Sequence, residues 1–101
     1  SAMKYAAARD GNQQDIVQAL RMVGASVIPC HTVGKGFPDL VVGYHGVNYL
    51  IEIKDPAQPK HRHELTPAQV DFHRDWRGQI AKVFTVKEAL AVIGALRGVV
   101  S

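Results

Sequence analysis

The sequence predicts a single α/β domain built around a mixed four-stranded sheet, with its elements in the order αβββαβα. Two capping boxes mark helix starts, a His-Gly pair separates two β-rich runs, and apolar residues recur at helical spacing near the amino end. The length of 101 residues suits one compact domain, which we expect to occupy residues 4–101. We interpret residues 1–3 as a cloning scar with the start methionine.

The composition excludes several classes of protein. Hydrophobic residues make up 47% of the chain, too many for a disordered segment, and a single cysteine excludes a disulfide scaffold. No apolar run approaches the roughly 20 residues that cross a bilayer, so we expect a cytoplasmic protein. The net charge of +3 is compatible with a polyanionic partner without demonstrating one.

The strands are predicted from short β-rich runs. They are expected at Ser26–Cys30, Asp39–Tyr44, Val47–Lys54 and Ile80–Phe84. Pro29 lacks a backbone N–H, which confines the first of these strands to a sheet edge or makes it end there. His31–Pro38 and Asp55–Glu64 are predicted loops, because they are rich in glycine, in proline or in polar residues.

The helices are predicted from periodicity and from start signals. Apolar residues at helical spacing predict the first helix from about Asn12 to Val23, just before a glycine. The capping box Thr66–Gln69 predicts a second helix that ends near Arg77, and the box Thr85–Glu88 predicts a last helix that reaches about Leu96.

The predicted hairpin places three charged side chains on one face. If Tyr44 and Val47 oppose each other across the two-residue turn, Asp39 lies opposite Glu52. Lys54 is two residues beyond Glu52 and projects from the same face, whereas a one-residue slip would send Asp39 to the other face. The other face is apolar and is expected to meet the core: Leu40, Val42, Tyr44, Val47, Tyr49, Ile51 and Ile53.

Two interpretations fit this charged cluster. Two carboxylates on directly opposed strand residues repel each other. A hard divalent cation such as Mg²⁺ removes this repulsion because it prefers oxygen ligands. An adjacent lysine can then hold a water molecule or stabilise charge on a phosphate. The other interpretation is a surface salt bridge of Lys54 with Glu52 or Asp39, worth roughly 0–1 kcal/mol.

The residues around the cluster resemble the PD-(D/E)XK nuclease signature. Gly36-Phe37-Pro38-Asp39-Leu40 is followed by Leu50-Ile51-Glu52-Ile53-Lys54 on the second strand of the hairpin. The downstream Leu65-Thr66-Pro67-Ala68-Gln69 and the upstream helix narrow the resemblance to the VRR-NUC group of phage, bacterial and DNA-repair nucleases. The resemblance covers about Gln13 to Ile93. It implies a restriction-endonuclease-like fold and Mg²⁺- or Mn²⁺-dependent hydrolysis of DNA.

The resemblance also implies a role for each matching residue. Asp39 and Glu52 would be metal ligands together with the main-chain carbonyl of Ile53, and Lys54 would activate water or stabilise charge. Gln69 matches a glutamine that the family often places near the site. Its membership of the capping box is an alternative that does not exclude this role.

The first helix departs from the family pattern. Relatives often carry a glutamate where this chain has Gln13, with Asp15 two residues further on. Gln13 can coordinate through its amide oxygen but adds no charge, which weakens metal affinity. Alternatively, Gln13 caps its own helix and Asp15 is a favourable first-turn acid. The number of metal ions per site therefore stays open.

Basic residues in the two loops are the predicted contacts to DNA. Lys60 and Arg62 can reach the phosphates, with a solvated basic loop as the alternative. Lys35, between two glycines, is better placed because its loop borders the predicted metal site. Phe72 and Trp76 lie four residues apart on one helix, and we expect them to pack in the core rather than stack on bases.

These observations predict a metal-dependent DNA endonuclease. Because so short a chain offers little surface for reading sequence, we expect it to select branched, flapped or four-way-junction DNA. A homodimer would let it engage two strands. The alternative, motivated by the missing glutamate, is a non-catalytic DNA-binding module on the same fold. A small protein-interaction domain is a third hypothesis.

Overall fold

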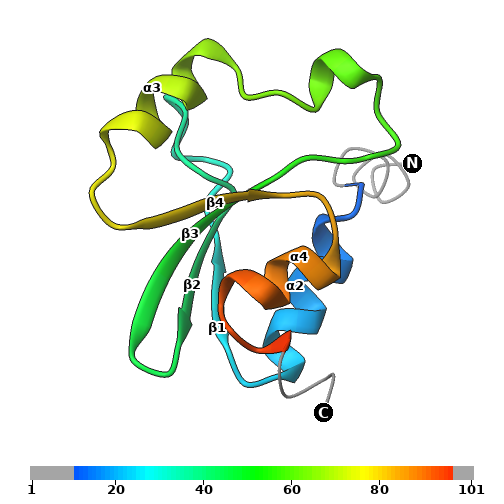
Figure 1. Ribbon diagram of the computed structural model, residues 1–101, viewed down its shortest axis with the longest axis vertical. Coiled ribbons are helices and arrows are strands. Elements are labelled where there is room, and N and C mark those ends of the chain that lie inside the picture. The colour runs from blue at the N-terminus through cyan, green and yellow to red at the C-terminus, as the bar shows by residue number, and fades with distance from the viewer. Residues whose placement is uncertain (1–10, 97–101) are drawn as a thin grey trace.

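The computed structural model describes residues 11–96 and shows an α/β domain with a four-stranded sheet (Figure 1). Residues 1–10 and 97–101, which include both ends of the predicted domain and the predicted scar, lie outside the described residues. The elements are α2 (Gln13–Met22), β1 (Ser26–Pro29), β2 (Leu40–Tyr44), β3 (Val47–Ile53), the 3₁₀ turn η1 (Lys60–Arg62), α3 (Pro67–Asp75), β4 (Gln79–Val83) and α4 (Val86–Val92). The predicted order αβββαβα is confirmed, with η1 added inside the predicted polar loop.

The sheet is mixed, as predicted. Its strands lie in the order β1-β2-β3-β4; the first two pairs are antiparallel, and β3 and β4 are parallel. A parallel pair needs a long crossover, and here the crossover contains η1 and α3. Helices α2 and α4 lie on one side of the sheet and α3 on the other (Figure 1). Pro29 ends the edge strand β1, where it pairs with Leu40.

The turn between β2 and β3 sets the register of the hairpin. His45 and Gly46 have φ angles of 51° and 80°, and two successive positive φ angles are typical of a type I′ turn. This turn matches the twist of the strands and pairs Tyr44 with Val47 and Leu40 with Ile51. The register predicted from the sequence is therefore confirmed.

The core lies between the sheet and the pair of helices α2 and α4. Leu40, Val42 and Ile51 of the hairpin are fully buried there, against apolar residues of α2 and α4: Ile16, Val17, Leu20, Ala89 and Leu90. The prediction was wrong for Val47, which is 39% exposed because it flanks the turn at the end of the hairpin.

Two helices end earlier than the sequence predicted. Trp76 adopts an extended backbone (φ −71°, ψ 130°), so α3 ends at Asp75 rather than near Arg77. Gly94 has a φ of 79°, and the N–H groups of Gly94 and Ala95 bond back to the last turn of α4. Such a left-handed glycine ends a helix, so the predicted extension of α4 to Leu96 is wrong.

The aromatic residues of α3 do not pack in the core, which corrects another prediction. None of the residues of α3 is buried, and Trp76 is 43% exposed. The ring of Trp76 stacks on the ring of Phe72, with 5.4 Å between their centroids and 16° between their planes. The two rings form a surface feature because α3 lies on the side of the sheet away from α2 and α4 (Figure 1).

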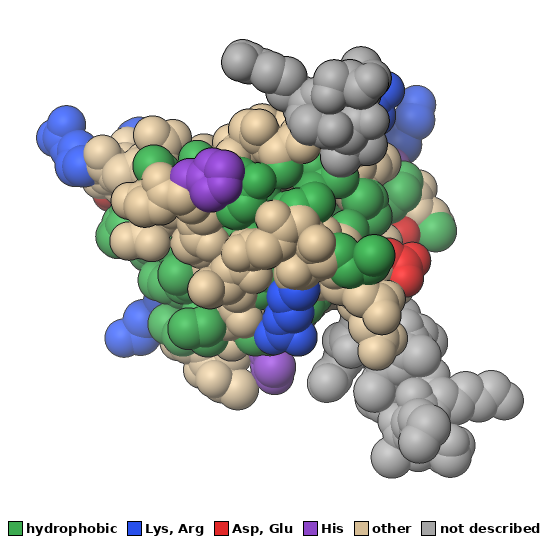
Figure 2. All heavy atoms as spheres, turned by 90° about the horizontal axis from the view of Figure 1, so that it is seen from below, with side chains coloured by type: hydrophobic (Ala, Val, Ile, Leu, Met, Phe, Trp, Pro, Cys, Tyr) green, Lys and Arg blue, Asp and Glu red, His purple; other side chains and the backbone are tan. Residues whose placement is uncertain are grey.

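The end of the molecule with the hairpin turn faces the viewer in Figure 2. Hydrophobic side chains cover much of this face, and Lys, Arg, Asp and Glu side chains lie at scattered positions. Within residues 11–96, no helix combines the length and the apolar character that crossing a membrane requires.

Candidate functional site

The site lies at the end of the hairpin away from the turn, where Asp39 precedes β2 and Glu52 ends the buried part of β3. Continuing the register one residue past Leu40 sets Asp39 opposite Glu52. Asp39 Oδ2 accepts a hydrogen bond of 2.7 Å from the backbone N–H of Ile53. The N–H and C=O of a strand residue point to the same neighbouring strand, so the carbonyl of Ile53 also faces the Asp39 side.

Glu52 is buried although it is charged in its ordinary state. Its exposed fraction is 3%, the lowest of any charged residue in the described part of the chain. Burial, followed by the neighbouring Asp39 carboxylate, raises the pKa of Glu52 to about 8 against an opposing effect of Lys54. Its Oε1 is buried without a hydrogen-bond partner in the structure. A buried carboxylate oxygen without a partner is costly and marks a position where a cation or proton would be stabilised.

Gln69 connects two of the candidate catalytic residues, Glu52 on β3 and Lys54 just after β3. Its Nε2 donates to Glu52 Oε2 (3.1 Å), and its Oε1 accepts from Lys54 Nζ (2.9 Å). The same Oε1 accepts from the backbone N–H of Thr66, and Thr66 Oγ1 accepts from the N–H of Gln69, which completes the capping box. Gln69 therefore caps α3 and reaches the site at the same time, so its two predicted roles coexist.

The salt bridge that the sequence offered as the alternative is not formed. Lys54 donates to the amide oxygen of Gln69 instead of to a carboxylate. Ion pairs in the described part of the chain involve Arg74, which contacts Asp71 and Asp75 on α3. The three charged groups of the hairpin thus share a face without neutralising one another directly.

The loop of residues 31–38, called the glycine loop here, brings Asp39 and α3 together. Gly36 has a φ of 79°, and a Cβ added there would lie 3.0 Å from the backbone N of Gln69 and 2.6 Å from the carbonyl carbon of Ala68. A larger residue at this position would push the loop away from the first turn of α3. Phe37 extends the contact because its ring meets the ring of Phe72 edge-on, with 5.3 Å between centroids.

The start of α2 approaches the same end of the sheet. The side-chain amide of Asn12 donates to the backbone carbonyls of Lys54 and Phe84, which lie just after β3 and β4. Gln13 is the first residue of α2, and Asp15 is exposed in the first turn. Within residues 11–96, no group of three or more His, Cys, Asp or Glu side chains could hold a metal ion. Asp15 therefore does not complete such a group, and coordination by Gln13 stays a prediction.

Sequence reasoning missed His73 as a member of this region. His73 lies one helical turn after Gln69 on α3, and its Nε2 is buried without a hydrogen-bond partner. Burial, Lys54 and Lys82 lower the pKa of His73, in that order of importance. The spacing of four residues from Gln69 was the available signal, because such residues lie on the same face of a helix.

The predicted DNA-binding residues lie in three different clefts. Arg62 lines a cleft of about 440 Å³ that also includes Ile53 and Lys54, so it adjoins the site. Lys60 lines a neighbouring cleft of about 540 Å³ together with Lys82. Lys35 lies on the other side of α3, in a cleft of about 500 Å³ that includes Phe72 and Trp76. The structure thus places Arg62 beside the predicted catalytic residues and separates Lys35 from Lys60 and Arg62.

Comparisons of this chain with protein-family models, with curated proteins and with solved structures found no match.

Proposed function

We propose that the protein is a metal-dependent DNA endonuclease with a restriction-endonuclease-like fold, of the VRR-NUC group. The observation that carries this proposal is the pair of opposed carboxylates of Asp39 and Glu52, with the buried Oε1 of Glu52 left without a partner. An amine and an amide lie at the same place, on Lys54 and Gln69. Such a combination of groups can hold a divalent ion and stabilise charge at a phosphodiester.

The donor set fits Mg²⁺ or Mn²⁺ better than a softer metal. Both ions take oxygen ligands, and Mg²⁺ is usually held by one or two carboxylates with water and substrate phosphate oxygens. Asp39, Glu52 and the backbone carbonyl of Ile53 would hold the ion. When bound, such an ion supplies neutralisation of phosphate charge and a lower pKa for a water molecule.

The residues of the chain would each perform a separate task. Asp39 is held in place by the N–H of Ile53, so its other oxygen remains available for a cation. Lys54 donates one hydrogen bond to Gln69, and its remaining N–H groups can orient the attacking water or the scissile phosphate. Arg62 lines the cleft that includes Lys54 and would bind a neighbouring phosphate of the DNA backbone.

A non-catalytic DNA-binding module on the same fold is the second candidate. One observation favours it: in the part of the chain that the structure describes, no third acid joins Asp39 and Glu52 in a metal-binding group. A site with two carboxylates carries less negative charge and binds a divalent ion more weakly. This candidate predicts salt-sensitive DNA binding and no cleavage in the presence of any divalent ion.

A cleavage panel distinguishes the two candidates. We expect incision of flapped or four-way-junction DNA with Mg²⁺ or Mn²⁺, little incision of linear duplex, and none with a chelator. Sedimentation of the same samples would test the proposed homodimer, which would present two sites to a branched substrate. Binding of all substrates without incision under any divalent ion would favour the non-catalytic module.

Mutation should separate the capping role of Gln69 from its role in the site. We expect Thr66→Ala to lower the free energy of unfolding by about 1 kcal/mol, because it removes the cap of α3, and to leave cleavage nearly unchanged. Gln69→Ala removes both the box and the contacts to Glu52 and Lys54, so it should destabilise similarly and also slow cleavage, by about 10-fold or more. Single-turnover kinetics and thermal unfolding of both variants make the comparison. Equal cleavage rates for the two variants would show that Gln69 acts only as a cap.

A further inference from the structure

The cleft that contains Lys35 has an aromatic wall that the proposed catalytic mechanism does not use. It has a volume of about 500 Å³ and is lined by Lys35, Ala68, Asp71, Phe72, Asp75 and Trp76. Most of these residues belong to α3, and Lys35 belongs to the glycine loop. The cleft therefore combines flat apolar rings with charged groups at its rim.

Trp76 is exposed and also held in place. Its ring stacks on Phe72, and Phe72 in turn meets Phe37 of the glycine loop. At the Nε1 edge of the indole, a Cβ added at Gly78 would lie 2.8 Å from Trp76 Nε1, so this edge lies directly against the chain at Gly78. An aromatic ring fixed in this way offers a flat binding face at a low cost in conformational entropy.

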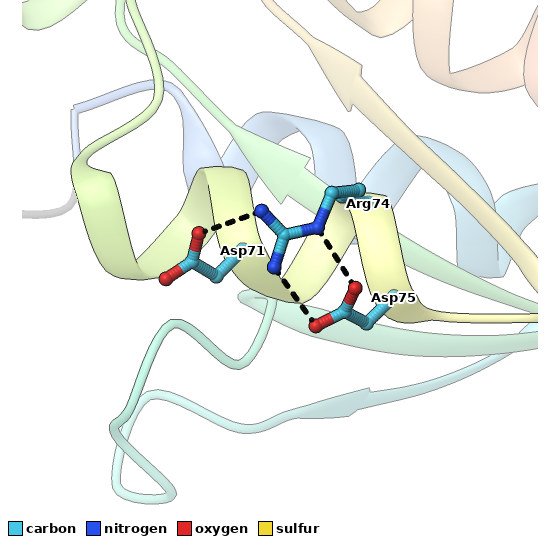
Figure 3. A network of polar contacts seen from close by, with 3 residues as sticks. All are labelled: Asp71, Arg74 and Asp75. Atoms are coloured by element: carbon cyan, nitrogen blue, oxygen red, sulfur yellow. Dashed lines mark hydrogen bonds and ion pairs between the residues drawn. The ribbon is translucent and has the colours of Figure 1, made fainter.

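The acidic residues at the rim are already paired. Arg74 lies between the carboxylates of Asp71 and Asp75 on α3 (Figure 3). It donates to Asp71 Oδ1 (3.2 Å) and to both oxygens of Asp75 (2.9 and 3.1 Å). This pairing reduces the repulsion that an incoming phosphate would meet. Lys35 then supplies a cation at the opposite rim, within the same cleft.

The cleft and the proposed active site both border α3. Ala68 lines the cleft, and the next residue, Gln69, contacts Glu52 and Lys54. On the loop side, Lys35 lies four residues before Asp39. The cleft and the site therefore meet at the first turn of α3.

We propose that this cleft binds one unpaired nucleobase of the DNA substrate, stacked on Trp76, with a neighbouring phosphate on Lys35. The inference rests on the proposed function and narrows its substrate to DNA with an unpaired base beside the cleaved strand. A base inside a duplex has both faces covered, so an unpaired or extruded base is what can stack here. Stacking on an aromatic ring tolerates all four bases, so the cleft selects structure rather than sequence.

Trp76 reports on this cleft directly because it is the only tryptophan of the chain. We expect a single-stranded oligonucleotide, added in the presence of a chelator, to quench the Trp76 fluorescence saturably. A flapped duplex should do the same, and a fully paired blunt-ended duplex should quench much less at equal concentration. Ala68→Leu, which fills the cleft and leaves the reporter in place, should abolish the quenching.

Variants measured by anisotropy of a labelled oligonucleotide extend the test. Trp76→Ala should weaken binding of the single strand about 5- to 100-fold, whereas Trp76→Phe keeps a ring and should stay within about threefold of the original chain. The matched control is His45→Asn, which removes an exposed ring at the far end of the hairpin and retains a residue suited to the positive φ angle. It should leave binding unchanged.

Several results would overturn the proposal. These are equal quenching by fully paired and unpaired DNA, unchanged quenching in Ala68→Leu, or unchanged single-strand affinity in Trp76→Ala. Quenching that grows with protein concentration without DNA would instead assign the cleft to a second copy of the chain. Cleavage is measured separately. Quenching without any cleavage would support the base-binding cleft and contradict the proposed nuclease activity. Cleavage without quenching would support the nuclease activity and contradict the base-binding cleft.

Discussion

Replacing Glu52 by glutamine is expected to reduce metal-dependent DNA cleavage by at least about 100-fold. The change preserves the shape of the side chain and its contact with Gln69, but it removes the charge that would hold the ion beside Asp39. Because Glu52 is buried, the neutral side chain should not destabilise the fold near pH 8. Single-turnover cleavage of the best substrate of the panel, with Mg²⁺ and with Mn²⁺, measures the effect.

Glu64→Gln is the matched control for this substitution. Glu64 is exposed and lines the cleft that includes Lys54, so the control removes the same charge from the same region without touching the pair. We expect its cleavage rate to stay within about threefold of the original chain. Substantial cleavage by Glu52→Gln, in a variant that binds DNA and unfolds cooperatively, would contradict the assigned role.

The stability of the protein is expected to fall as the pH rises toward 8, and divalent ions should restore it. The pKa of Glu52 rises from 4.5 to about 8 on folding, with burial as the first cause and Asp39 as the second. Between these two values the folded chain keeps a proton that the unfolded chain has lost, so a rise in pH favours unfolding. The slope approaches about 1.4 kcal/mol per pH unit between pH 6.5 and 7.5.

His73 acts in the opposite direction at lower pH. Its pKa is lowered on folding, mainly by burial, so below about pH 6.5 the unfolded chain binds the extra proton and the contribution of His73 to stability rises with pH. The contribution of His73 fades above its ordinary pKa, so measurements above about pH 7 report mainly on Glu52. Between about pH 4.5 and 6.5 the contributions of Glu52 and His73 to stability therefore oppose each other.

Addition of Mg²⁺ or Mn²⁺ near pH 8.5 should restore the stability that the protein loses as the pH rises. An ion at 100 times its dissociation constant stabilises the folded chain by about 2.7 kcal/mol. At pH 5.5 the ion must displace the proton of Glu52, so the same addition should have little effect. Thermal unfolding at the two pH values, with ion and with chelator, measures both effects. The same ion response or the same slope in Glu52→Gln would show that another group causes them.

Local signals in the sequence were enough to predict the elements and the hairpin register. The capping box at Thr66 and the His45-Gly46 turn depend on residues close together in the chain, and both are present in the structure. The alternation of β3 then placed Asp39, Glu52 and Lys54 on one face before any tertiary contact was known. A side-chain period of two leaves no other arrangement once the turn is set.

Contacts between distant segments decided what surrounds those residues. The sequence alone determined which face carries the two acids and the amine, because strand geometry and a two-residue turn are local properties. Only the tertiary structure buried Glu52 and joined it through Gln69 to Lys54. It also brought His73 near Lys54 and left Trp76 on the surface. All four outcomes depend on where α3 returns across the sheet. That position is set by packing between the glycine loop and α3 rather than by the periodicity of either segment.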